Sequence, residues 1–436
     1  MTDNIKAQLK SNTFYIIKMA LKFKSLKQIG YIFFLIIPSL LLLSCSKETQ
    51  VVQEPTRDID IKIPHIHIKI GDSSEIDSKD YKAAQIFIDS KGGFKDIQVS
   101  GKVAGRGNYS WSLPKKPYKI KFDNAQSIFG LPAYKKWVLL AEYMDGSMLY
   151  NSIPFGTAYL LKLPYSNHIF PVDVTINGQY RGLYILTESL EVGKGRIDIG
   201  EDGTLLELDS YYDEKWKFIS GKFKLPVMVK YPEEEDMTEE KLTEIKGDFE
   251  ALEKLIYATD FPNNNYLDLF HDTAFVDYMI VYQLSANFEI NHPKSTYMNK
   301  KSNGKYKMGV IWDFDWAMGY NDITGIHYDP AYATSPLIYE NGNNPGTKFF
   351  GRIMQDPKIQ KLFLHRWKWF RQHKYQSLRK FVSDYSLLIN ESYKEDHNLW
   401  GLRGSTGVLA SDLQRALSWL DARADYIDDY ADSFNQ

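Results

Sequence analysis

The strongest constraint on the fold is a hairpin pattern near the middle of the chain. Residues 172–188 alternate apolar and polar side chains on both sides of Asn177-Gly178. An Asn-Gly pair between alternating segments favours a two-residue type I′ turn, because both residues accept left-handed backbone angles. Similar patterns predict further strands at 61–70, 82–89, 94–103, 115–122, 203–209, 296–300 and 306–312. The chain therefore contains antiparallel hairpins.

Helical patterns interrupt these strands and then replace them. Apolar residues at spacings of three and four predict a helix over 238–257 with Thr238 as its cap, and a buried helix begins near Asp272. From about Gly346 onward the pattern is helical, at 348–354, 357–375, 378–394 and 405–434. The predicted fold class is α+β, with a mixed domain at 61–345 and a C-terminal helical lobe at 346–436 that packs on it.

Two carboxylates follow the last predicted strand. The apolar run before them leads into Asp313-Phe-Asp315, and Gly319 comes shortly after. If the strand continues that far, both side chains point to the same face. Adjacent carboxylates repel unless a cation lies between them, and a divalent metal such as Mg²⁺ or Mn²⁺ is the usual one. The alternative is a pair of strand-end carboxylates in water or in salt bridges.

A polar, irregular segment at 287–295 lies between the buried helix and this last hairpin. The order is thus buried helix, polar loop, hairpin and aspartate. Protein kinases arrange their catalytic loop, two short strands and metal-binding aspartate in the same order. Order alone does not establish function, since one fold can carry many activities.

At these residues the chain resembles the CotH kinase family. Five segments match in sequence order, at 106–122, 137–151, 174–188, 287–295 and 312–316. The resemblance implies a diverged protein-kinase-like fold and metal-dependent phosphoryl transfer from ATP or a related nucleotide. The chain departs from the family pattern at Glu289, where the family usually has aspartate, and at Ser295, where asparagine is common.

The resemblance also implies roles for individual residues. Asp313 would be the main metal ligand, and Glu289 would orient or deprotonate the acceptor hydroxyl. Phosphate groups would be bound by Lys119 or Lys121 with Arg106 nearby. Further roles fall to Asp315 and Asn291 as additional metal ligands and to Glu188 as a partner of the nucleotide-site lysine.

Simpler interpretations of these residues stay open. Lys119 and Lys121 share a face of one predicted strand, and they are equally compatible with a solvent-facing edge. Glu188 is compatible with a surface carboxylate. Glu207 and Asp209 are within reach of the site in some arrangements, but the sequence does not decide. His65 and His67 also share a strand face, as zinc ligands would, but no third ligand is near, so a solvated face is favoured.

The N-terminal segment predicts export and lipid attachment. Lysines precede an apolar run from Tyr31 to Ser44, which is shorter than the roughly 20 residues of a membrane span. The run ends at Cys45, the single cysteine of the chain. This layout resembles a bacterial lipobox. The interpretation is a lipoprotein signal at 1–45, a polar tether at 46–60, and a protein anchored in the cell envelope outside the cytoplasm.

Composition limits the partners. The net charge is −2, which gives no reason to expect nucleic acid as a partner. The chain has 30 tyrosines, a high content, and their rings are compatible with either binding surfaces or a core. The expected partners are a nucleotide, an extracytoplasmic protein or glycan acceptor, and a membrane through the anchor. Two rivals stay open: a non-catalytic surface module that binds glycans or a protein, and a sugar-nucleotide transferase.

Overall fold

The computed structural model describes residues 62–401 and 404–435. From Lys62 onward the chain forms one compact unit. The predicted signal at 1–45, with Cys45, and the predicted tether at 46–60 lie outside the described residues. Within the described part, no helix is both long enough and apolar enough to cross a bilayer.

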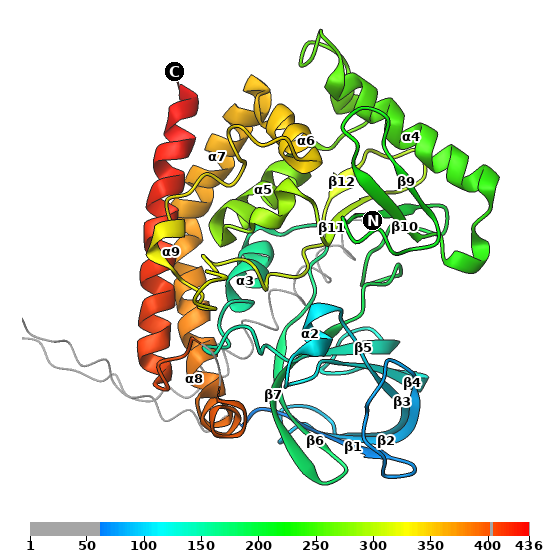
Figure 1. The fold of residues 1–436 in the computed structure, drawn as a ribbon, viewed down its shortest axis with the longest axis vertical. Coiled ribbons are helices and arrows are strands. Elements are labelled where there is room, and N and C mark those ends of the chain that lie inside the picture. The colour runs from blue at the N-terminus through cyan, green and yellow to red at the C-terminus, as the bar shows by residue number, and fades with distance from the viewer. Residues whose placement is uncertain (1–61, 402–403, 436) are drawn as a thin grey trace, which may run out of the picture. The chain divides into compact units, whose positions relative to one another are not determined.

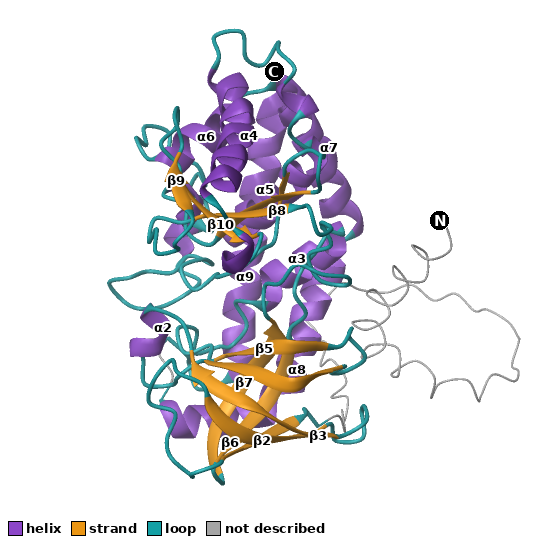
Figure 2. Cartoon of the chain, turned by 90° about the vertical axis from the view of Figure 1, so that its right-hand side faces the viewer, coloured by secondary structure: helices purple, strands orange, loops and turns teal. Residues whose placement is uncertain are grey.

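The N-terminal part of this unit, up to Glu188, is a closed seven-stranded barrel (Figures 1 and 2). Its strands follow the order β1-β2-β3-β4-β5-β7-β6. The closing pair, β1 with β6, is parallel, and the other neighbouring pairs are antiparallel. The strands are β1 (His65–Ile70), β2 (Lys82–Asp89), β3 (Ile97–Gly105), β4 (Tyr118–Gln126), β5 (Tyr134–Leu140), β6 (Phe170–Ile176) and β7 (Gln179–Glu188).

The Asn177-Gly178 hairpin is confirmed. Ile176 pairs with Gln179, and the two residues between them have φ values of 51° and 80°. These left-handed angles are those of a type I′ turn, which matches the right-handed twist of the flanking strands. The Asn177 side chain also accepts from the backbone N–H of Ile70 at 2.9 Å, so the turn is joined to β1.

A second, five-stranded sheet has the order β12-β11-β8-β10-β9. Its strands are β8 (Thr204–Leu208), β9 (Lys217–Ile219), β10 (Pro226–Tyr231), β11 (Thr296–Lys300) and β12 (Lys307–Met308). The predicted strand at 306–312 is wrong in its extent, because β12 ends at Met308. Gly309 N still donates to the Tyr297 carbonyl of β11 at 3.1 Å, and the chain from Val310 to Phe314 has no regular structure.

The helices lie mainly in the second half of the chain. Short α2 (Tyr109–Ser112) and α3 (Ser152–Leu161) belong to connections in the barrel region. The others are α4 (Glu239–Tyr257), α5 (Asp272–Ser285), α6 (Pro345–Met354), α7 (Pro357–His373), α8 (Tyr375–Trp400) and α9 (Leu409–Asp432). The α+β class and the helical C-terminal part are thus confirmed. Figure 1 shows α7, α8 and α9 beside one another.

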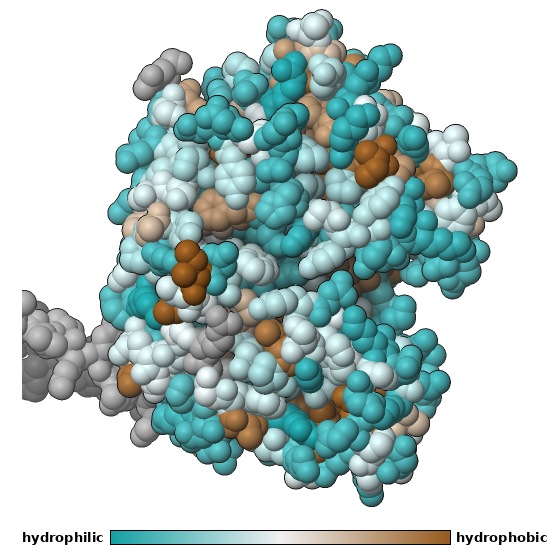
Figure 3. All heavy atoms as spheres, in the orientation of Figure 1, coloured by the Kyte–Doolittle hydropathy of each residue, from teal (hydrophilic) through white to brown (hydrophobic). Residues whose placement is uncertain are grey.

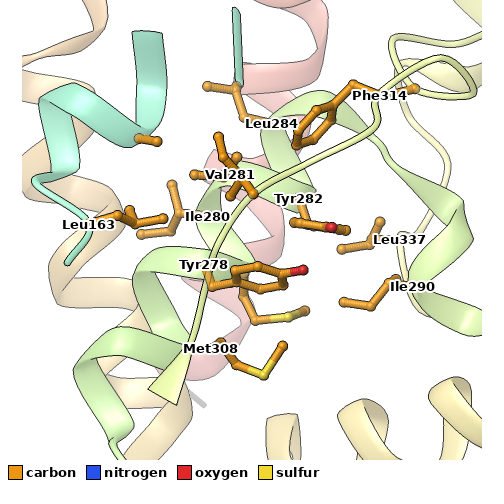
Figure 4. Close-up of a cluster of buried hydrophobic side chains, with 14 of the residues drawn as sticks. Leu163, Tyr278, Ile280, Val281, Tyr282, Leu284, Ile290, Met308, Phe314 and Leu337 are labelled. Carbon is orange, nitrogen blue, oxygen red and sulfur yellow. The ribbon is translucent and has the colours of Figure 1, made fainter. Parts of the chain in front are cut away.

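The main core surrounds α5, whose residues from Ala274 to Ser285 are all buried (Figure 4). Several tyrosines belong to this core rather than to a binding surface, including Tyr278 and Tyr282, which stack at 4.4 Å between ring centroids. The face of the unit seen in Figure 3 is mostly hydrophilic, with hydrophobic residues scattered over it. The core holds the two sheets and the helices as one framework.

Candidate active site

A cavity of about 300 Å³ lies between the barrel and the second sheet. This volume is at the lower end of the range for small-molecule pockets. The barrel contributes the turn after β3, the segment after β5 and the start of α3. The opposite wall comes from β8, β10, the loop at 289–295 and the segment at 312–316. The cavity is therefore built from segments that are far apart in the sequence.

Asp313 and Asp315 both line this cavity, but strand alternation is not the reason. Asp313 has a left-handed backbone with φ of 57°, which a residue other than glycine rarely adopts. Between them, Phe314 is fully buried beside Leu284 and Tyr282 (Figure 4). Asn287 Nδ2 donates to the Asp313 carbonyl at 3.1 Å. The buried ring and the turn around it direct both carboxylates into the cavity.

Asp315 belongs to a network of hydrogen bonds with the barrel side. Tyr150 Oη donates to Asp315 Oδ1 at 2.5 Å, and the His327 ring donates to the Asp315 carbonyl at 2.9 Å. Burial and the charge of Asp313 raise the pKa of Asp315 to about 7, although Tyr150 and Arg106 lower it. Burial also raises the pKa of Asp313, which opens into the cavity but is enclosed by protein on its other sides. The site thus holds more negative charge than its own cations balance.

Glu142 adds a further carboxylate that the sequence analysis gave no role. It is 4% exposed, lines the cavity, and has a left-handed φ of 55°. Asn151 Nδ2 donates to its Oε1 at 2.8 Å, whereas its Oε2 has no partner among the described residues. Burial, followed by the charge of Asp315, raises the pKa of Glu142 well above its ordinary value. Its neighbour Asp145 accepts from three backbone N–H groups and so fixes the turn that carries Tyr150.

Glu289 reaches the same cavity from the loop after α5. Its backbone N–H donates to Asn287 Oδ1 at 3.2 Å, so the residue that holds Asp313 also holds Glu289. Burial and the charge of Asp313 raise the pKa of Glu289 to about 8, and Lys294, at 3.5 Å, opposes this rise. A carboxyl group with this pKa is suited to exchange a proton near neutral pH.

Arg106 brings positive charge into the cavity from the barrel. Its guanidinium lies 5.6 Å from the centre of the Trp312 ring, and burial lowers its pKa while Asp313 and Asp315 raise it. The glycines around it serve local packing: a Cβ at Gly105 would lie 2.3 Å from the Trp111 ring. A Cβ at Gly107, whose φ is +80°, would lie 2.2 Å from Ser110 Oγ. This close packing fixes the turn that carries Arg106, which lines the same cavity as the two aspartates.

Lys119 and Lys121 require a correction, because neither lines the cavity. Lys119 lies 4.7 Å from the centre of the Tyr81 ring, and Lys121 is exposed on β4. The lysine that lines the cavity is Lys115, which is fully buried and donates to Asp396 Oδ1 at 2.6 Å and to the Leu183 carbonyl at 2.5 Å. Its partner lies 281 positions away, so no local sequence signal could identify it.

Glu188 and Asn291 also lie elsewhere than expected. Glu188 pairs with His168, at 2.6 Å from Nδ1, and does not line the cavity. Asn291 is fully buried and is occupied by the backbone: its Nδ2 donates to the carbonyls of Phe288 and Leu337, and its Oδ1 accepts from Tyr339 N and Thr347 Oγ1. The structure therefore gives Asn291 the position of a loop anchor and not that of a metal ligand.

The residues that the sequence left undecided do line the cavity. Glu207 accepts from Tyr297 Oη at 2.6 Å and lies 3.4 Å from Lys230. Asp209 accepts from the backbone N–H of Ser295 at 2.9 Å and so fixes that residue, whose φ is 42°. His65 and His67 lie far from this site on the barrel, where their rings stack at 4.0 Å. No third ligand joins them among the described residues.

Aromatic rings from both walls surround the mouth of the cavity. Tyr109 is 43% exposed, Trp316 is 38% exposed, and their ring centroids are 6.2 Å apart. Tyr211, at 53% exposure, lies on the other side, with Lys294 at 5.0 Å from its ring centre. The Tyr109–Trp316 pair thus joins the barrel side of the cavity to the opposite wall.

The donor set fits a hard divalent cation. The described residues contain no group of three histidine, cysteine or acidic side chains close enough to bind a metal by themselves. Mg²⁺, however, commonly uses one or two carboxylates and takes its other ligands from phosphates and water. Asp313 and Asp315 are a pair of this kind, and the orphaned Glu142 oxygen adds acceptor capacity nearby.

Comparison with known proteins identifies a family for most of the chain. The model of the CotH kinase protein family matches residues 103–427, from the end of the third barrel strand to the last long helix. The chain belongs to the CotH kinase family. Membership suggests a kinase-like function and the use of a nucleotide. A search of curated proteins finds no match to the chain.

Proposed function

We propose that this protein transfers the γ-phosphoryl group of ATP, or of a related nucleoside triphosphate, to a hydroxyl group of an extracytoplasmic acceptor. The observation that carries the proposal is that Arg106, Asp313, Asp315 and Glu289 meet in one cavity. Phosphoryl transfer needs charge neutralisation and a proton acceptor more than it needs covalent chemistry from the protein. This set of residues offers both, and a protein-kinase-like fold is part of the proposal.

The roles follow from the contacts. Asp313 and Asp315 would hold Mg²⁺ or Mn²⁺, which when bound draws charge from the phosphate oxygens. Arg106 faces the same two carboxylates and would bind the polyphosphate. The acceptor oxygen forms a bond to the γ-phosphorus, the bond from that phosphorus to the bridging oxygen breaks, and the nucleoside diphosphate leaves. Glu289 takes the proton of the acceptor hydroxyl.

The glutamate in place of aspartate is compatible with this role. Its side chain is one methylene longer than aspartate, and Asn287 fixes its backbone at 3.2 Å. Bound cations would lower its raised pKa toward the range in which a carboxylate accepts a proton at neutral pH. Ser295 lines the cavity beside it, at the position where asparagine is common in the family.

A thermal-shift experiment tests this proposal. Mg-ATP should raise the melting temperature of the wild-type protein, whereas Mn-UDP-sugar and a plain oligosaccharide should not. Asp313→Asn should abolish the metal-dependent shift, and without ligand its melting temperature should equal or slightly exceed that of the wild type, because one charge of the acidic cluster is removed. A wild-type protein that ignores both nucleotides would contradict the proposal, and collapse of the Asp313→Asn fold would identify a structural aspartate.

The alternative function is a non-catalytic binding module on the same scaffold. Exposed Tyr109, Trp316 and Tyr211 around the mouth favour it, because such rings stack on sugars and planar groups. The Tyr150 contact that occupies Asp315 also favours it. Stabilisation by oligosaccharide alone would select this alternative, and stabilisation by Mn-UDP-sugar alone would select a sugar-nucleotide transferase.

We also propose that the protein is exported and held in the cell envelope through lipid attached to Cys45. The apolar run before this cysteine and the polar segment after it support the proposal. Cys45→Ser should move the protein from the membrane fraction to the soluble fraction and stop incorporation of labelled fatty acid. Unchanged membrane association of Cys45→Ser would exclude this anchor.

A further inference from the structure

A buried arginine on the last long helix contacts two segments that lead to the cavity. Arg423 of α9 is fully buried. Its Nε donates to the Gln283 carbonyl at 2.6 Å, and its Nη2 donates to Gln283 Oε1 at 2.9 Å. Its Nη1 donates to the carbonyls of Ser335 at 2.5 Å and Ala333 at 3.2 Å. The guanidinium thus joins the end of α5 to the long loop that follows Trp316.

The electrostatics explain how this cation is tolerated in the core. All four acceptors are carbonyl or amide oxygens, and Gln283 lies in the last turn of α5. The carbonyl end of a helix carries partial negative charge that favours a cation. Burial lowers the pKa of Arg423 to about 10, so the group keeps its charge at neutral pH. A neutral side chain of similar length would leave these carbonyls without a donor.

The end of α5, which Arg423 holds, is in turn hydrogen-bonded to the segments that carry the acidic residues of the cavity. The Ser285 carbonyl accepts from Met318 N at 2.7 Å, three residues after Asp315. Asn287 holds the Asp313 carbonyl through its Nδ2 and Glu289 N through its Oδ1. Ser285 and Asn287, which make these contacts, lie two and four residues after Gln283. Displacing the end of α5 would therefore move both acidic segments of the site.

Further hydrogen bonds fix the long loop that follows Trp316. Trp419, one turn before Arg423 on α9, donates from Nε1 to the Asp329 carbonyl at 3.0 Å. Asn291 then holds the Leu337 carbonyl and Tyr339 N. The loop is thus fixed both to α9 and to the segment that carries Glu289.

We infer that Arg423 is a positioning residue of the active site: it sets the relative placement of Glu289 and the Asp313–Asp315 segment without touching the substrate. The inference rests on the proposed function for its kinetic consequence, but its structural consequence can be measured separately. Reacting groups that shift by about 1 Å can lose roughly a hundredfold in rate. Loss of Arg423 should therefore lower turnover more than it lowers nucleotide binding.

The test compares Arg423→Met, Arg423→Lys and the control Arg371→Met in the full chain. Arg371 on α7 also binds α9, through Asp425 and Asp428, but its hydrogen bonds reach neither the end of α5 nor the loop at 329–337. In Arg423→Met, hydrogen exchange should rise by at least tenfold at residues 283–291, 313–318 and 329–337, and stay within about twofold in the barrel strands. Arg423→Lys should give an intermediate increase, and Arg371→Met should leave these three segments unchanged.

Kinetics supply the second readout. Arg423→Met should lower kcat by at least tenfold with a less than threefold change in KM for Mg-ATP, and Arg423→Lys should recover part of kcat. If the wild type transfers no phosphoryl group, the proposed function fails, while the exchange pattern still decides the positioning role. Exchange that rises uniformly over the chain, or equally in Arg371→Met, would overturn the inference.

A milder variant covers the case in which Arg423→Met does not fold. Trp419→Phe keeps one aromatic ring in place, removes the Nε1 donor to Asp329 and leaves a smaller packing gap than an aliphatic residue would. It should raise exchange at 329–337 and lower kcat by roughly threefold. No change in either quantity would count against control of the site by α9.

Discussion

At the scale of single residues, the site brings four carboxyl groups together, two of them buried and two open to the cavity. Asp313, Asp315, Glu142 and Glu289 face one cavity, and the pKa of each is raised. Such crowding reduces stability when no cation is bound. It is the arrangement expected where a protein gives up stability to bind cationic or metal-associated ligands.

Asp315→Asn tests this cost of negative charge. The pKa of Asp315 is about 7 in the folded protein and near 3.9 in an unfolded chain. A raised carboxyl pKa means that the folded state binds the extra proton, so stability falls as pH rises between these values. At pH 8 without metal, the variant should melt roughly 2–4 °C above the wild type. At pH 4 the difference in melting temperature should vanish. Equal melting temperatures at pH 8 would show that the charge of Asp315 does not destabilise the folded state.

His65 gives a pH effect of opposite sign. Burial and the neighbouring His67 lower the pKa of His65 to about 4, from 6.5 in an unfolded chain. The unfolded state therefore binds the proton first, and this contribution to stability is lost as pH falls from about 6.5 toward 4. His65→Gln should reduce the loss of melting temperature between pH 7 and pH 4.5. A wild type and variant with parallel pH profiles would exclude this role for His65.

Sequence predicts a site residue when the pattern that marks it lies nearby in the chain, and it fails when the partners are distant in sequence. Local patterns predict three of the acids: a hairpin precedes Asp313 and Asp315, and a polar loop after a buried helix contains Glu289. Arg106 follows from a glycine-rich turn. The lysine prediction fails because alternation shows which residues share a face but not which part of the barrel meets the second sheet. Lys115, Glu142 and Arg423 depend on partners that only the folded chain brings close.

At the scale of elements, local rules predict the strands and helices well. The Asn177-Gly178 turn, the capped helix α4 and the helices after Gly346 all depend on neighbours within a few residues. The closed barrel does not, because its parallel β1–β6 pair joins segments about a hundred residues apart. The last hairpin is shorter than predicted because the chain leaves the sheet to bury Phe314.

Helix α8 is tied to the barrel by a buried ion pair, which gives a prediction at this scale. Lys115 and Asp396 are both fully buried and lie 2.6 Å apart, and Asp396 Oδ1 also accepts from Leu183 N at 2.7 Å. Asp396→Leu should destabilise the protein by about 3–5 kcal/mol, because it leaves a buried ammonium without a counter-charge. The double variant Lys115→Met, Asp396→Leu should recover most of that loss in urea denaturation. If the double variant is no more stable than the single one, hydrogen bonds to Asp396 dominate instead of charge.

At the scale of the whole molecule, the cavity depends on parts contributed by most of the chain. The barrel supplies Arg106 and Glu142, the second sheet and its loops supply Glu207 and Glu289, and α9 holds the segments behind them. The family match over residues 103–427 covers these residues and begins near the end of β3. The catalytic proposal therefore concerns the barrel, the second sheet and the helices together and not the barrel or the helices alone.

The most direct test of the central claim is the equilibrium binding of ATP, measured by calorimetry with and without Mn²⁺. The account predicts that wild-type binding requires the metal and that Arg106→Met and Asp313→Asn each weaken it by at least tenfold. Lys119→Met, which changes a lysine outside the cavity, should bind as the wild type does. Binding that survives in both cavity variants, or that is lost in Lys119→Met, would contradict the shared metal–nucleotide cavity.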